Sequence, residues 1–261
     1  MVRFYRLLAG VILASLILVG CVIPAPVVLD GSGAVVTREL DLSGFDQIEV
    51  SHAFTARVTR GDEFSVVIRI DDNLERYLEV VAVGRVLKIG LRPTVGLTGR
   101  HTLEADVTLP ELRSLKASGA SRVTVSGFAS EERLSLDASG ASKIDLDVSA
   151  GAVKMDVSGA SNVNGALSAG DVDISVSGAS KVTLTGAGDD ARLEASGASR
   201  IDLSEFVAQN ADVEASGASR LIVNATGIID VKASGASHVE YLGGARLERV
   251  DTSGASSVRA R

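Results

Sequence analysis

The sequence predicts an all-β fold, and within that class a single-chain parallel β-helix, or solenoid. The tetrapeptide Ser-Gly-Ala-Ser recurs eight times at intervals of 18 to 21 residues, beginning at Ser118, Ser139, Ser158, Ser177, Ser196, Ser216, Ser234 and Ser253. Residues on both sides of each copy alternate between apolar and polar, which is typical of strands with one buried face. Each coil of about 19 residues would lie on its predecessor, and the handedness rule for parallel crossovers predicts a right-handed coil.

The chain begins with a segment typical of an exported bacterial protein. Residues 1–20 carry Arg3 and Arg6, followed by an apolar run over 7–19 that is shorter than the roughly 20 residues needed to span a bilayer. This pattern predicts a signal peptide. Leu18-Val19-Gly20-Cys21 resembles the bacterial lipobox, which implies cleavage before Cys21 and a lipid on its thiol. We therefore predict an extracytoplasmic protein whose membrane contact is this N-terminal lipid. The alternative is an ordinary signal peptide with an incidental cysteine.

Two segments precede the regular repeats. Residues 21–37, with Pro24, Pro26 and a Gly-Ser-Gly run, are expected to be a tether. Residues 38–115 lack the tetrapeptide but contain strand patterns, and Val83-Gly84-Arg85-Val86 predicts a tight hairpin. Because terminal repeats are atypical, we expect this segment to form irregular first coils that cap the solenoid.

Residues 116–261 are expected to form the regular β-helix, with the eight tetrapeptides at its corners. The residue three positions before each tetrapeptide is apolar in every copy: Leu115, Leu136, Met155, Ile174, Leu193, Val213, Val231 and Val250. The residue four positions after each corner Gly is apolar too: Val123, Ile144, Val163, Val182, Ile201, Leu221, Val239 and Val258. Burial of one such side chain stabilises a fold by roughly 1.5 to 3 kcal/mol, so these two columns predict the core.

The tetrapeptide itself has a structural explanation. Gly allows a turn with positive φ, and Ala is expected where coils stack too closely for a larger side chain. The Ser hydroxyls are expected to bond backbone groups at the corner, or one another along the stack. A catalytic serine is a poor alternative, because eight equivalent nucleophiles would serve no single reaction.

The order of several motifs resembles the head-GIN-domain family. These motifs are Phe45-Asp46-Gln47-Ile48-Glu49-Val50, then Thr59-Arg60-Gly61-Asp62-Glu63, Val86-Leu87-Lys88-Ile89 and Leu109-Pro110-Glu111-Leu112-Arg113-Ser114-Leu115, followed by the Ser-Gly-Ala-Ser coils. The resemblance covers residues 45–258, although the sequence has no Gly-Ile-Asn tripeptide. It implies a bacterial, exported, β-helical protein with an adhesin-like role, and it supplies no catalytic residues.

Composition and spacing narrow the possible functions. A net charge of −7 argues against nucleic acid as a partner. The spacers between tetrapeptides are consumed by strands, which leaves no long loop to wall a catalytic cleft. Alternation places the pairs Asp145/Asp147 and Asp171/Asp173 on solvated faces, and the three His have no metal-ligand spacing. We therefore expect a non-catalytic module without a cofactor. The alternatives are an envelope scaffold or sensory lipoprotein that binds a cognate protein, and, less favoured, a polysaccharide-active enzyme.

One surface feature has a candidate binding role. The residue just after the tetrapeptide is basic in five copies and is expected to point outward: Arg122, Lys143, Lys181, Arg200 and Arg220. The residue two positions before the tetrapeptide is mostly acidic. We favour mutual neutralisation of the two columns around the corner. The alternative is that the basic column binds a surface ligand, either a protein or an anionic polysaccharide.

Overall fold

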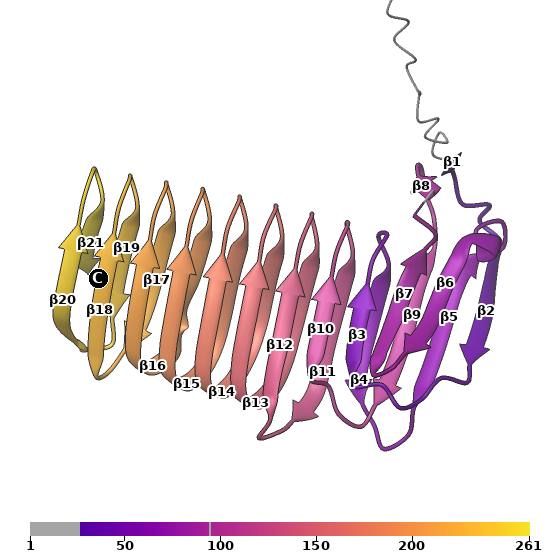
Figure 1. The fold of residues 1–261 in the computed structure, drawn as a ribbon, viewed down its shortest axis with the longest axis horizontal. Coiled ribbons are helices and arrows are strands. Elements are labelled where there is room, and N and C mark those ends of the chain that lie inside the picture. Colours follow the sequence, from indigo (N-terminus) through magenta and orange to yellow (C-terminus); the bar gives the residue numbers. More distant parts are fainter. Residues whose placement is uncertain (1–26, 94) are drawn as a thin grey trace, which may run out of the picture.

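The computed structural model describes residues 27–93 and 95–261 and confirms the all-β class. The described chain forms a β-solenoid whose coils follow one another along the long axis of the molecule (Figure 1). Within these residues the only helix is a single 3-10 turn, η1 (Glu75–Tyr77), and none is long and apolar enough to cross a membrane. The predicted right-handedness of the coil stays a prediction.

Each regular coil contributes one strand before its corner and one after it, on two opposite faces of the solenoid. The pre-corner face contains β10 (Ser114–Ala117), β12 (Arg133–Ala138), the second halves of β13 to β16, β18 (Ile228–Ala233) and β20 (Arg246–Thr252). The post-corner face contains β11 (Arg122–Ala129), the first halves of β13 to β16, β17 (Arg220–Ala225), β19 (His238–Leu242) and β21 (Ser257–Ala260). The long strands that bend from one face to the other are β13 (Lys143–Val157), β14 (Asn162–Val176), β15 (Lys181–Ala195) and β16 (Arg200–Ala215).

The two predicted apolar columns form the core between these faces. They stack in parallel register, and every member from Leu115 to Val239 is at most 1% exposed. The last coil differs: Val250 is 41% exposed and Val258 is only partly buried. In the described chain, β20 and β21 each pair with one neighbour, β18 and β19, so their inward side chains are covered from one side.

The corners confirm the role predicted for Gly and correct the one predicted for Ala. The corner glycines have φ between 69° and 75°. The Ala N–H donates to the Gly carbonyl of the preceding coil at 2.7–2.8 Å, yet the Ala side chain in most corners is exposed. The close approach is at Gly, because a Cβ on Gly159 would lie 2.4 Å from the carbonyl oxygen of Gly140.

The second Ser of each corner points into the solenoid. Seven of these serines, from Ser121 to Ser237, are at most 2% exposed. The hydroxyl of Ser142 donates to the carbonyl of Ser139 at 2.8 Å, and that of Ser237 donates to Ala215 at 3.4 Å. These hydroxyls satisfy corner carbonyls as predicted, whereas the buried Oγ atoms of Ser161 and Ser219 have no hydrogen-bond partner among the described residues.

Chain order and spatial order differ at the N-terminal end. Strand β3 (Gln47–Val50) pairs with both β10 and β7 (Val86–Leu91), while β4 (Thr55–Arg60) pairs with both β11 and β9 (Leu103–Leu109). The coil β3–β4 therefore lies between the coil built from β7 and β9 and the first regular coil. Antiparallel strands cover the outer side: β2 (Val35–Leu40), β5 (Ser65–Asp71) and β6 (Leu78–Val83) (Figure 1). Strands β6 and β7 form the predicted hairpin.

The described part of the expected tether contains two strands. β1 (Val27–Leu29) pairs with β8 (Val95–Leu97), and β2 begins at Val35. The buried carboxylate of Asp71 holds this segment, because it accepts the N–H of Gly33 at 2.9 Å and that of Thr102 at 2.7 Å. Residues 27–37 of the predicted tether therefore belong to the folded part of the chain, where β1 pairs with β8 and β2 pairs with β5.

A corner without the tetrapeptide joins β3 to β4. Its residues are Ser51-His52-Ala53-Phe54, and His52 and Ala53 have φ of 58° and 65°, although neither is Gly. Phe54 is fully buried at the position that a buried Ser occupies in later coils. The regular stack therefore begins one coil earlier than the tetrapeptides indicate.

Candidate binding surfaces

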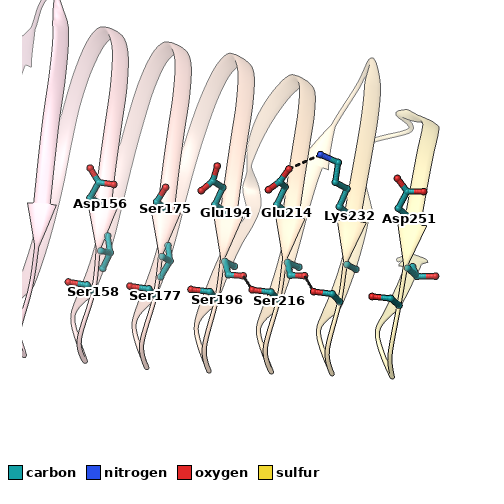
Figure 2. Close-up of a pocket in the computed structure, with 18 of the residues that line it drawn as sticks. Asp156, Ser158, Ser175, Ser177, Glu194, Ser196, Glu214, Ser216, Lys232 and Asp251 are labelled. Atoms are coloured by element: carbon teal, nitrogen blue, oxygen red, sulfur yellow. Dashed lines mark hydrogen bonds and ion pairs between the residues drawn. The ribbon is translucent and has the colours of Figure 1, made fainter.

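A shallow groove of about 760 Å³ runs along the pre-corner face beside the corners. Figure 2 shows how it is built: successive strands present a side chain of the acidic column and, two residues later, the first Ser of a tetrapeptide. Alternation along each strand explains this, because Asp156 and Ser158 point outward while Val157 between them is buried. The lining carries five carboxylates and one ammonium: Asp137, Asp156, Glu194, Glu214, Asp251 and Lys232.

Cations of the same face pair with these carboxylates. Lys232 Nζ lies 2.7 Å from Glu214 Oε1 in the preceding coil, and Arg192 Nη2 lies 2.9 Å from Glu194 Oε1 in its own strand. The hydrogen bond and charge of Lys232 hold the pKa of Glu214 below its ordinary value, and Glu214 in turn raises the pKa of Lys232. Glu214 is therefore ionised at neutral pH and suits attraction of cations rather than proton donation.

The first serines of the corners form a row of hydroxyls along the groove. Ser216 Oγ donates to the Ala195 carbonyl at 3.4 Å, and Ser234 Oγ donates to Ala215 at 3.5 Å, so each reaches back to the preceding coil (Figure 2). These are weak bonds at the limit of normal length. The row can therefore exchange them for bonds to water or to a ligand.

A second hollow of about 590 Å³ lies on the same face. Asp171 and Asp173 line it, which agrees with the solvated position predicted for this pair. Asp145 and Asp147 lie on the opposite, post-corner face. Among residues 27–93 and 95–261, no group of three or more His, Cys, Asp or Glu side chains is arranged to hold a metal ion.

The predicted basic column is aligned on the post-corner face. Arg122 pairs in register with Lys143, and Lys181, Arg200 and Arg220 follow one another in consecutive coils. In the described residues no ion pair joins this column to the acidic column, which faces the opposite way. Mutual neutralisation around the corner is therefore wrong, because the two columns point away from each other.

The cations of the basic column instead reach along their own strands. Lys143 Nζ lies 2.7 Å from Asp145 Oδ2, and Arg200 Nη2 lies 3.4 Å from Asp202 Oδ2. Burial tends to raise the pKa of Asp202, but hydrogen bonds from Ser204 and Arg200 outweigh it, and the pKa is lowered. Asp202 is therefore held ionised beside Arg200.

The predicted lipid site cannot be placed with these surfaces. Cys21 lies outside the described residues, as does the whole predicted signal peptide. The structure assembles two separate surfaces: the groove with its acidic column and serine row on the pre-corner face, and the basic column on the post-corner face. Sequence patterns locate both columns, but they do not distinguish the first Ser of each corner, which lines the groove, from the second Ser, which is buried.

Comparison with known proteins gives one family and several similar folds. The family model described as "Putative auto-transporter adhesin, head GIN domain" matches residues 44–245. No curated protein matches. A crystal structure of a putative lipid binding protein from Parabacteroides distasonis ATCC 8503 is 20% identical, with a TM-score of 0.82 over 90% of this chain and 99% of that chain.

Two further crystal structures have the same architecture. A putative adhesin from Parabacteroides distasonis ATCC 8503 is 18% identical, with a TM-score of 0.81 over 90% of this chain and 100% of its own. A putative adhesin from Parabacteroides merdae ATCC 43184 is 17% identical, with a TM-score of 0.80 over 90% and 99%. At these identities the likeness establishes the shared fold.

Proposed function

The chain belongs to the family described as "Putative auto-transporter adhesin, head GIN domain", and from this premise we propose that it is a non-catalytic, adhesin-like module of the bacterial cell envelope. In this role the solenoid presents a long, repeated surface to an extended partner molecule. The names given to two structurally similar proteins, both putative adhesins, support this proposal.

The observation that carries the proposal is repetition in register. The same outward position recurs coil after coil, for example from Lys143 through Asn162 and Lys181 to Arg200. Because paired strands lie about 4.8 Å apart, each face offers a one-dimensional array of nearly equivalent contacts. Many weak contacts of this kind add up when one extended molecule engages several of them.

The charge state of the surface carboxylates supports binding over catalysis. A polysaccharide-cleaving enzyme needs a carboxylic acid that stays protonated near neutral pH. Here each surface carboxylate with a shifted pKa is shifted downward by hydrogen bonds that include a basic partner: Glu214 by Lys232, Glu240 by Arg259, and Asp202 by Ser204 and Arg200. Such groups are suited to ionic contacts.

The proposed attachment to the membrane is through a lipid on Cys21. The lipobox-like residues 18–21 support it. In this arrangement the N-terminal strands β1 and β2 are nearest to the membrane, and the regular coils extend away from it. Both charged faces are then held at a distance from the bilayer, where a partner can reach them.

The anchoring is tested by labelling with a palmitate analogue. We expect the full chain expressed in a bacterial host to incorporate label and to sediment with membranes, whereas Cys21→Ala incorporates none. Cys21→Ser is the matched control, because it keeps the size of the side chain but removes the thiol, and it should behave like Cys21→Ala. Equal labelling of wild type and Cys21→Ala would contradict the lipid anchor.

The binding role is tested on the same cells. Cells that display the wild-type chain should attach to immobilised polysaccharides more strongly than cells that express Cys21→Ala. Purified protein incubated with the same polysaccharides should release no new reducing ends. Release of reducing ends would replace the proposal with an enzymatic function.

A further inference from the structure

We propose that the post-corner face binds a linear anionic polysaccharide laid along the solenoid axis, through the consecutive cations Lys181, Arg200 and Arg220. This inference rests on the adhesin-like function proposed above and names the class of ligand. The three residues occupy the same position in successive coils, at the start of β15, β16 and β17. A polymer parallel to the axis would meet all three.

The basic column is an arrangement that the stability of the fold does not require. Like charges directly opposite each other on neighbouring strands are destabilising. On the groove side, Glu194 lies opposite Glu214, but Arg192 and Lys232 pair with them. On the basic side, the three consecutive positions are all cationic, and in the described chain only Arg200 has an acidic partner.

The residue two positions after each cation of the column determines whether that cation has an acidic partner in its own strand. It is Asp202 beside Arg200, but Thr183 beside Lys181 and Ile222 beside Arg220. Lys181 and Arg220 therefore have no ion-pair partner among the described residues, and both are exposed. Arg200 is the paired member of the column, because its Nη2 lies 3.4 Å from Asp202 Oδ2.

The spacing of the free cations suits a regular polymer. Lys181 and Arg220 are two coils apart, which is roughly 10 Å at the usual separation of about 4.8 Å between paired strands. Acidic groups on a polysaccharide with one acid per disaccharide recur at a similar interval. Such a chain could place successive acids on Lys181 and Arg220, with a hydroxyl near Arg200.

The overall charge of −7 is spread over both faces, and the post-corner face itself carries Asp145, Asp147 and Asp202. The carboxylates of the groove lie on the pre-corner face, on the far side of the core. Packed sheets are about 10 Å apart, so the groove carboxylates are further from a ligand on this face than the cations of the basic column are. A polyanion would meet the basic column together with the carboxylates of the same face, of which Asp202 is paired with Arg200 and Glu240 with Arg259.

The test uses the full chain in detergent with three probes: heparin, which carries sulfates, polygalacturonate, which carries carboxylates, and neutral dextran. We expect binding to one or both polyanions, weakening with added salt, and none to dextran. Lys181→Gln combined with Arg220→Gln should weaken binding about threefold to thirtyfold, because two exposed ion pairs are lost. Asp202→Asn should tighten binding, because it releases Arg200.

The matched control is Lys154→Gln combined with Arg192→Gln. It removes the same charge from the pre-corner face, where these residues pair with Asp156 and Glu194. We expect it to change polyanion affinity less than twofold. Equal weakening by both double variants, or no binding of wild type to either polyanion, would overturn this proposal. If cells still attach in a Cys21-dependent manner in that case, only the ligand class is wrong and the adhesin-like function stands.

Discussion

At the scale of single residues, Gly159 shows what a corner demands. Its φ is +75°, and a Cβ there would meet the Gly140 carbonyl at 2.4 Å. We expect Gly159→Ala to lower the free energy of unfolding by about 2–5 kcal/mol, from the left-handed backbone and the backbone clash. Gly84→Ala is the control, since Gly84 has φ of +60° with open space around it, and it should cost only about 1–2 kcal/mol. Chemical denaturation measures both, and equal losses would contradict the stacking contact.

The residue scale also shows what repetition in the sequence reveals and what it hides. Eight copies predict a turn, but Gly and Ala repeat equally often, so the pattern alone cannot say which of them meets the next coil. The repeat pattern does not reveal the corner at 51–54, because His52 and Phe54 stand where the later corners have Gly and Ser. A signal was present: Ile48 lies three positions before Ser51 and Ala56 lies four positions after His52, as in the regular apolar columns.

At the scale of elements, the pair Glu214–Lys232 joins β16 to β18. Because Lys232 lowers the pKa of Glu214, the pair stabilises the fold above the ordinary carboxylate pKa of about 4.3, and this contribution is lost as the pH falls through the lowered value. We expect the Glu214 carboxyl, followed by NMR, to titrate at higher pH in Lys232→Gln than in wild type. Lys154→Gln, which removes a lysine that pairs with Asp156, should leave it unchanged. A midpoint unaffected by Lys232→Gln would show that the pair does not form in solution.

Element positions were predictable to different degrees. Alternation and spacing placed both charged columns correctly, because a strand's side chains must point to alternate faces. Their ion pairs were not predictable in this way. Lys143 and Arg200 reach two residues along their own strands, a contact set by side-chain length and not by the repeat. The strands at 27–29 and 35–40 were missed because their partners, β8 and β5, are distant in the sequence.

At the scale of the whole molecule, each regular coil is hydrogen-bonded only to the coils on either side. Deletion of residues 162–180 removes one complete coil and joins Ser161 to Lys181, which restores a tetrapeptide followed by a cation. We expect this variant to keep a β-type circular dichroism spectrum and a cooperative unfolding transition, because β13 can pair with β15 in the same register.

The matched control for this deletion removes residues 162–171 only. Half a coil cannot return the chain to the next corner, so buried and exposed positions are exchanged and the fold should fail. A variant without residues 162–180 that is as unstable as this control would contradict independent stacking.

The interleaved coil β3–β4 has a consequence for the order in which the chain can fold from its N-terminus. Both sides of this coil are covered by strands that come later, β7 and β9 on one side and β10 and β11 on the other. Its two strand edges therefore stay unpaired until the chain is available to the end of β11 at residue 129. Every later coil finds its template already present when it emerges. The stage at which strand edges are most exposed therefore comes early in folding, because each later coil adds to an edge that is already formed.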